Sequence, residues 1–165
     1  MRSLILLLLL SAACRPTDPS NACSQAGDPA LLAIGTRDGD TVVPWTLDEA
    51  VAIEFGPQGG SHTWIDIAAE HLAETRAELT VRVDVEARFL DTGAEVPEEV
   101  TYTNAPFQCQ AGNAMIADHV QVFVSGVGGV YGCRNPAVVT VTLGALTTSA
   151  EVTLVAPPGC SDAVP

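Results

Sequence analysis

The chain has 165 residues, 47% of them hydrophobic and 16% charged, with 20 acidic against 7 basic side chains and a formal net charge of -13. This length predicts one domain of ordinary size, and the apolar content excludes a chain that is disordered throughout. The negative charge excludes nucleic-acid binding through phosphate contacts and a polybasic anchor on anionic lipid, because both need a basic surface.

Residues 1–13 are predicted to be a signal peptide. Arg2 supplies a positive charge ahead of the aliphatic run from Leu4 to Leu10, which is too short for a membrane span of about 20 apolar residues. Small residues then lead into Cys14, and this segment resembles a bacterial lipoprotein signal, in which that cysteine becomes the acylated first residue. Ser11 stands where the pattern usually has a large aliphatic residue, so secretion without a lipid is kept as the alternative.

The resemblance implies a palmitate-bearing lipid on Cys14, with the membrane as a partner and the bacterial cell envelope, at the outer membrane, as the location. Residues 14–26 include two prolines and several small polar residues, so they are predicted to be the lipidated cysteine followed by a flexible tether. Residues 27–160 are predicted to form a single domain, and residues 161–165 a short tail.

In the first half of the domain, short apolar runs between turn residues predict strands at Leu31–Ile34, Val42–Trp45 and Val51–Phe55. The next segment, Ile65–Leu72, fits both a helical stripe and a strand alternation. We predict a strand that runs to Ala68.

The strand pattern is clearest in the second half. From Thr80 to Phe89, apolar side chains alternate with polar ones, which is typical of a half-buried strand. Short strands are predicted at Val100–Thr103 and Val120–Ser125, and a terminal hairpin at Val138–Val155 with its turn from Gly144 to Ser149. Many short strands separated by Gly/Pro turns predict an all-β domain, an immunoglobulin-like β-sandwich of about seven to nine short antiparallel strands.

Cysteine counting predicts two disulfides. With Cys14 assigned to the lipid, the four others are Cys23, Cys109, Cys133 and Cys160, an even number in a compartment where disulfides persist. We predict a bridge between Cys109 and Cys133, which flank one strand. We also predict a bridge between Cys23 and Cys160, which would connect the two ends of the domain. A zinc site is disfavoured because no two cysteines lie within five residues of each other.

The most distinctive string runs from Phe55 to Trp64 and reads FGPQGGSHTW. Its glycines free the backbone, so Gln58, His62 and Trp64 are candidate ligand-binding residues beside it. The alternative is a wide hairpin turn with glycine at positive φ and the indole packed on the sheet.

This string, with Ile34-Gly35-Thr36 and an Asp-Gly turn before it, resembles a group of uncharacterised secreted bacterial proteins over residues 27–90. The resemblance implies no activity, since none is known for the group.

Metal binding has a few candidate ligands, namely His62, His71 and His119. A blue-copper site is disfavoured because its loop carries Cys, His and Met in that order, whereas here Cys109 and Met115 precede His119. Calcium is disfavoured because the acidic turns fit no twelve-residue calcium loop.

No nucleophile elbow or phosphate-binding glycine loop is present, so we expect no catalysis and no cofactor. A sandwich with a polar outer face suits display, adhesion or assembly. The sequence therefore favours a monomeric, non-catalytic surface binding or structural module, with an envelope or extracellular protein as partner. The alternative function is a metal- or small-ligand-binding envelope protein that uses the glycine-rich string.

Overall fold

The structure is a computed structural model that describes residue 23 and residues 27–57, 60–74, 76–85, 99–110, 114–124 and 133–160. The predicted signal peptide, Cys14 as the predicted lipidation site and the predicted tail lie outside the described residues, as does the predicted tether apart from Cys23.

Ten β-strands account for most of the described residues, and none of these residues is helical. The strands are β1 (Ala30–Asp38), β2 (Thr41–Pro44), β3 (Glu49–Ala52), β4 (Glu54–Phe55), β5 (Ser61–Glu70), β6 (Arg76–Val85), β7 (Glu99–Cys109), β8 (Ala114–Phe123), β9 (Arg134–Leu143) and β10 (Leu146–Val155). Within the described ranges, no helix is long and apolar enough to cross a membrane. The predicted all-β class is therefore confirmed.

Most predicted strands are found and are longer than predicted, but the strand predicted at Val51–Phe55 is divided at Ile53 into β3, which pairs with β10, and β4, which pairs with β5. The ambiguous segment forms β5, which confirms a strand and extends it to Glu70. In β6, Val81 and Val83 are buried while Thr80 and Arg82 alternate with them on the outer face. Residues 86–89 of that predicted strand lie outside the described residues.

The terminal hairpin is confirmed, but its predicted turn is wrong. The turn consists of Gly144 and Ala145 alone, because Leu143 already pairs with Leu146 across β9 and β10. Gly144 has a φ of 59° at the first turn position, a conformation that glycine adopts without strain in a two-residue hairpin loop. The predicted turn residues up to Ser149 belong to β10.

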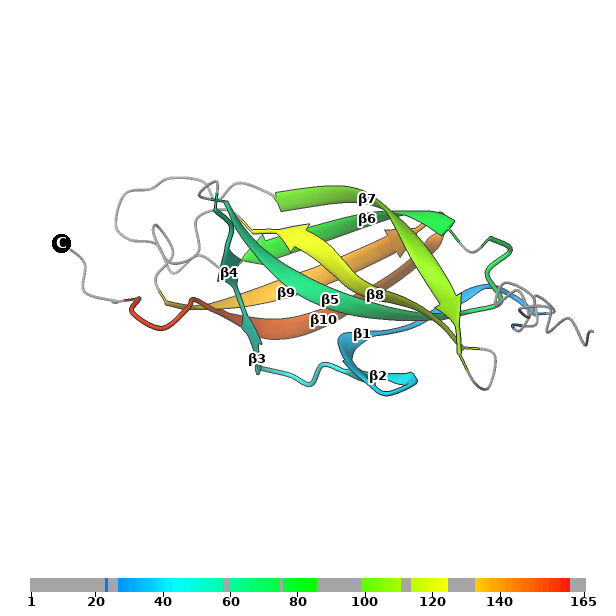
Figure 1. The fold of residues 1–165 in the computed structure, drawn as a ribbon, viewed down its shortest axis with the longest axis horizontal. Helices are drawn as coiled ribbons and strands as arrows, with labels where there is room; N and C mark the ends of the chain where they lie inside the picture. Colours follow the sequence, from blue (N-terminus) through cyan, green and yellow to red (C-terminus); the bar gives the residue numbers. More distant parts are fainter. Residues whose placement is uncertain are drawn as a thin grey trace, which may run out of the picture.

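The strands form one curled sheet in the order β2-β1-β5-β8-β7-β6-β9-β10-β3, and β4 pairs with β5 (Figure 1). Strand β7 joins the two halves of this sheet. It pairs with β6 as far as Pro106 and with β8 from Phe107 onward. Among the described pairs only β3 with β10 is parallel, so the prediction of purely antiparallel strands is wrong at this edge.

The hydrophobic core lies between the two halves of the curled sheet. Strand β5 contributes Ile65 and Ile67 from one half, and β6 contributes Val81 and Val83 from the other, all at most 1% exposed. Burying a side chain of this size stabilises the fold by about 1.5–3 kcal/mol. The inner face of β5 is therefore committed to the core, and only its outer face is available for contacts with other molecules.

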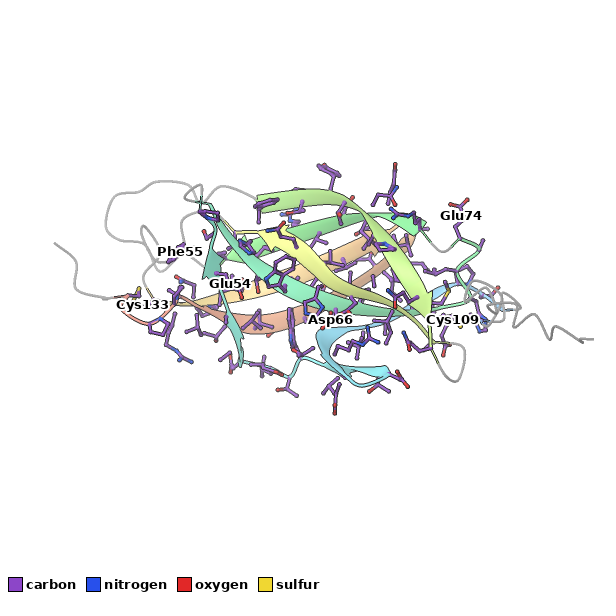
Figure 2. The ribbon with its side chains drawn as sticks, viewed as in Figure 1. Glu54, Phe55, Asp66, Glu74, Cys109 and Cys133 are labelled. Atoms are coloured by element: carbon purple, nitrogen blue, oxygen red, sulfur yellow. A yellow bond between two sulfur atoms is a disulfide. The ribbon has the colours of Figure 1, made fainter. Side chains whose placement is uncertain are left out.

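The disulfides connect Cys23 with Cys109 and Cys133 with Cys160, so both predicted pairings are wrong. Cys109 precedes β8 and Cys133 follows it, and a ten-residue strand separates its ends by about 30 Å. A disulfide needs Cα atoms within about 7 Å of each other. Figure 2 shows Cys109 and Cys133 at opposite ends of the molecule, where each bonds to the cysteine nearest in space. The two disulfides indicate an oxidising, non-cytoplasmic compartment.

Gly35 allows β1 and β2 to approach closely next to the outer face of β5. A Cβ atom at this position would lie 2.7 Å from the carbonyl carbon of Val43 and closer still to its oxygen. Because these are backbone atoms of the paired strand, no side-chain rotation relieves the overlap. This approach explains the glycine in the Ile34-Gly35-Thr36 string.

Candidate functional site

Strand β5 places three polar or aromatic side chains in a row on its outer face. Side chains alternate along a strand, so His62, Trp64 and Asp66 point away from the core that Ile65 and Ile67 enter. Trp64 is 39% exposed, whereas His62 and Asp66 are nearly covered by their neighbours. This row, together with the side chains that contact it from β1, β4 and β8, is the candidate site and is called here the Trp64 face.

At one end of the Trp64 face, Glu54 holds the indole in place. Glu54 of β4 pairs with His62 of β5, and the Trp64 Nε1–H group donates to Glu54 Oε2 over 3.1 Å. The same carboxylate oxygen lies 3.6 Å from His62 Nε2. The His62 and Trp64 rings meet edge to face, with centroids 5.3 Å apart, a favourable geometry for aromatic rings.

A β-bulge brings a second histidine to the indole. Two residues of β8, Asp118 and His119, lie opposite the single residue Asp66 of β5. His119 has a φ of 50°, in the left-handed region that histidine enters more readily than most residues. Bulges re-aim side chains, and here the His119 ring lies 6.2 Å from the Trp64 ring. Trp64 therefore contacts an imidazole on each side.

The Asp66 carboxylate holds the backbone of this bulge in place by hydrogen bonds. One oxygen accepts from the backbone N–H of Arg37 on β1, and the other accepts from the backbone N–H of His119 on β8, both over 2.7 Å. Asp66 is only 7% exposed. A buried carboxylate that accepts two backbone N–H groups thus ties the neighbouring strands β1, β5 and β8 together, and Figure 2 shows Asp66 near the middle of the molecule.

Asp118, the other residue of the bulge, forms ion pairs with Arg37 and His119. Its carboxylate accepts from the Arg37 guanidinium over 2.8 Å and contacts His119 Nδ1. Burial acts to raise the pKa of Asp118, but hydrogen bonding with Asp66 and His119 and the charges of His119 and Arg37 outweigh it. Together they hold the pKa of Asp118 below its ordinary value of 3.8.

Replacing Asp118 by asparagine is expected to flatten the acid part of the stability curve. Because the folded pKa of Asp118 is lowered, its stabilisation is complete above the unfolded pKa near 3.8 and is lost as the pH falls through the lower folded value. The free energy of unfolding, measured by urea titration from about pH 6 to about pH 2, should fall less for the variant than for the native chain.

Asp40→Asn is the matched control, since it removes one carboxylate from the exposed turn before β2. It is expected to leave the acid slope unchanged. If Asp118→Asn and the native chain lose stability in parallel, the ionised Asp118 does not stabilise the fold.

The structure brings some of the predicted site residues together. His62 and Trp64 contact each other, and His119 contacts Trp64. Gln58 lies outside the described residues. His71 follows the far end of β5, beside Glu70, and its ring packs on Gly27. Nine residues of strand separate it from His62, about 30 Å, so these two histidines do not form one site.

The glycine-rich string itself forms a hairpin loop between β4 and β5, closed by a hydrogen bond from the Gly56 N–H to the Gly60 carbonyl over 2.7 Å. Gly60 is not among the residues with positive φ, and Gly59 lies outside the described residues.

Sequence reasoning missed Asp66, Asp118, Arg37 and Glu54 as members of this site. One signal was present: Asp66 stands between two isoleucines in an apolar run. A carboxylate in such a run must be paired once the strand is buried. The other residues carry no local signal, because their proximity depends on strand pairing and on the bulge.

Among the described residues, one group has potential ligand atoms close enough together to hold a metal ion. Ligand atoms of Asp66, Asp118 and His119 lie within 4.8 Å of one another. However, both Asp66 oxygens accept backbone N–H groups and Arg37 donates to Asp118. The two carboxylates therefore already have hydrogen-bond donors or a counter-charge. The geometry fits a role in holding the bulge backbone in place better than a cation site.

No protein-family model and no curated protein matches the sequence. Among solved structures, the CooA pilin subunit from enterotoxigenic Escherichia coli is similar at a TM-score of 0.34 with 12% identity, over 76% of this chain and 97% of that chain. A similarity of this size does not place the chain in a family.

Proposed function

We propose that the protein is an envelope-anchored lipoprotein, held by a lipid on Cys14, whose immunoglobulin-like β-sandwich acts as a non-catalytic binding module. Support for the anchor comes from the resemblance of residues 1–14 to a lipoprotein signal and from the compartment that the disulfides indicate. Support for a sandwich comes from the two sheet halves around one core and from β7, which changes its pairing partner at Pro106.

The binding surface in this proposal is the Trp64 face, and one observation carries it: Trp64 is exposed and yet held in place. The indole is 39% exposed, its N–H is bonded to Glu54, and an imidazole contacts it on each side. Rigid, partly exposed tryptophans are frequent energetic centres of protein interfaces, because little conformational entropy is lost on binding.

A second candidate function is a metal- or small-ligand-binding envelope protein. It is favoured by the proximity of ligand atoms in Asp66, Asp118 and His119. It ranks below the binding module because Arg37 and two backbone N–H groups compete for the same carboxylate oxygens.

Photo-crosslinking on cells of the native host tests the binding module. A photoreactive phenylalanine derivative replaces Gln121, which pairs with Trp64 across β5 and β8. We expect a discrete protein adduct that disappears when Trp64→Ala is added. The control places the same probe at Tyr102, which is 78% exposed on the other sheet half, and should give no such adduct.

Cys14→Ser in the same background should move the chain from the membrane to the soluble fraction. Identical adducts from both probe positions, or none from position 121, would contradict a binding role of the Trp64 face. Retention of Cys14→Ser in the membrane would contradict the lipid anchor.

A further inference from the structure

A small cleft opens beside Trp64, between the outer face of β5 and strands β3 and β4. Its volume is about 200 Å³, and Trp45, Trp64, Glu49 and Glu54 line it. Both tryptophans of the chain therefore border the same space. In Figure 2, Glu54 lies in the half of the molecule that carries Cys133, on the other side of Asp66 from Cys109.

Hydrogen bonds hold both indoles at the cleft. The backbone N–H of Trp45 donates to the Ile34 carbonyl over 3.1 Å, and its Nε1–H donates to Thr36 Oγ1 over 3.0 Å. The Trp64 Nε1–H donates to Glu54. Since both indole N–H groups already have acceptors, what the rings offer to a ligand is their π systems, and Trp64 offers the larger surface because Trp45 is only 9% exposed.

Hydrogen bonds also position the two carboxylates. Glu49 Oε2 accepts from the Thr46 backbone N–H over 3.0 Å and from its hydroxyl over 3.3 Å. Glu54 accepts from Trp64. None of the described lining residues is an arginine, lysine or histidine. The cleft thus combines two aromatic rings with two carboxylates, and the basic side chain of His62 lies outside the lining, 3.6 Å from Glu54 Oε2.

We propose that this cleft binds a single organic cation, a guanidinium or alkylammonium group. Indole is the side chain with the strongest cation–π attraction, and the carboxylates match the charge of such a group. The net charge of -13 attracts cations toward the surface. This inference rests on the proposed binding function of the Trp64 face and specifies the chemistry that the face recognises.

The size of the cleft limits the ligand to a headgroup. Pockets for drug-sized molecules occupy about 300–1,000 Å³, whereas this one has about 200 Å³. Calcium does not suit the lining, since it takes six to eight oxygen ligands and indole rings supply none. An arginine or lysine side chain, or a small free amine, matches both the volume and the lining.

The test titrates the full chain, purified in detergent, with N-acetylarginine amide while tryptophan fluorescence is recorded. Both tryptophans line the cleft, so the signal reports directly on it. We expect saturable quenching by the arginine compound and at least tenfold weaker binding of N-acetylcitrulline amide, which has the same shape without the charge. Equal binding of the two compounds would overturn the proposal.

Glu49→Gln/Glu54→Gln should weaken arginine binding at least tenfold, while the amide oxygens still accept the hydrogen bonds from Thr46 and Trp64. The matched control is Glu74→Gln/Glu78→Gln, which removes two exposed carboxylates outside this cleft. Equal losses in both double variants would show a general charge effect and overturn the site. Glu54→Gln alone repeats the test if the double variant fails to fold.

The cation could belong to a protein side chain or to a free small molecule, and a five-residue peptide with a central arginine distinguishes these two sources. Binding at least tenfold tighter than the amide supports a protein partner that presents a basic side chain, and equal binding supports a free small cation. If the adduct at position 121 persists but no arginine compound binds, the Trp64 face keeps its binding role and the cation proposal falls. If arginine binds but no adduct forms, the cation site stands without the protein-binding function.

Discussion

Replacing both Cys23 and Cys109 by alanine is expected to lower the free energy of unfolding by about 4.5 kcal/mol. The bridged residues are 86 positions apart, and closing so long a loop removes much of the entropy of the unfolded chain. The Cys133–Cys160 bridge spans 27 positions, so its removal should cost about 3.5 kcal/mol. Urea unfolding of the two double variants measures both values.

Single variants test the pairing independently of stability. With the pairing in the structure, Cys23→Ala should leave a free thiol at Cys109, detected by alkylation and peptide mass spectrometry. A free thiol at Cys160 would instead support the end-to-end pairing that the sequence favoured. An equal loss of stability from the two double variants would contradict the dependence on loop length.

The second large effect is expected at Asp66. Asp66→Asn keeps the size of the side chain but leaves one acceptor oxygen for the backbone N–H groups of Arg37 and His119. One N–H group of a part-buried hydrogen bond is then without its acceptor, at a cost of about 2–3 kcal/mol, the upper range for hydrogen bonds to charged groups. Urea unfolding measures the loss, and amide hydrogen exchange at Arg37 and His119 should accelerate.

Asp84→Asn is the matched control, because the Asp84 carboxylate accepts from the exposed Arg82 side chain. Exposed pairs of this kind contribute at most about 1 kcal/mol, so this change should be nearly neutral. If Asp66→Asn is as neutral as Asp84→Asn and exchange at both amides is unchanged, Asp66 does not clamp the bulge.

The Trp64 face shows how far a local pattern predicts a site. His62 and Trp64 are two residues apart on one strand, so alternation alone places them on the same face, and the structure confirms their contact. His119 is added by a one-residue bulge in another strand, and Glu54 by the pairing of β4 with β5. The local sequence of β5 does not predict either of these strand pairings.

The sequence alone determined the all-β class, the inner face of β6 and the terminal hairpin, because each depends on the alternation of neighbouring side chains or on one turn glycine. Only the tertiary structure decided which cysteines pair, that β3 runs parallel to β10, and that Asp66 meets Arg37 and His119. These contacts join residues far apart in the chain, and they depend on the lengths and registers of whole strands. A change of one residue in register moves a side chain to the opposite face of the sheet.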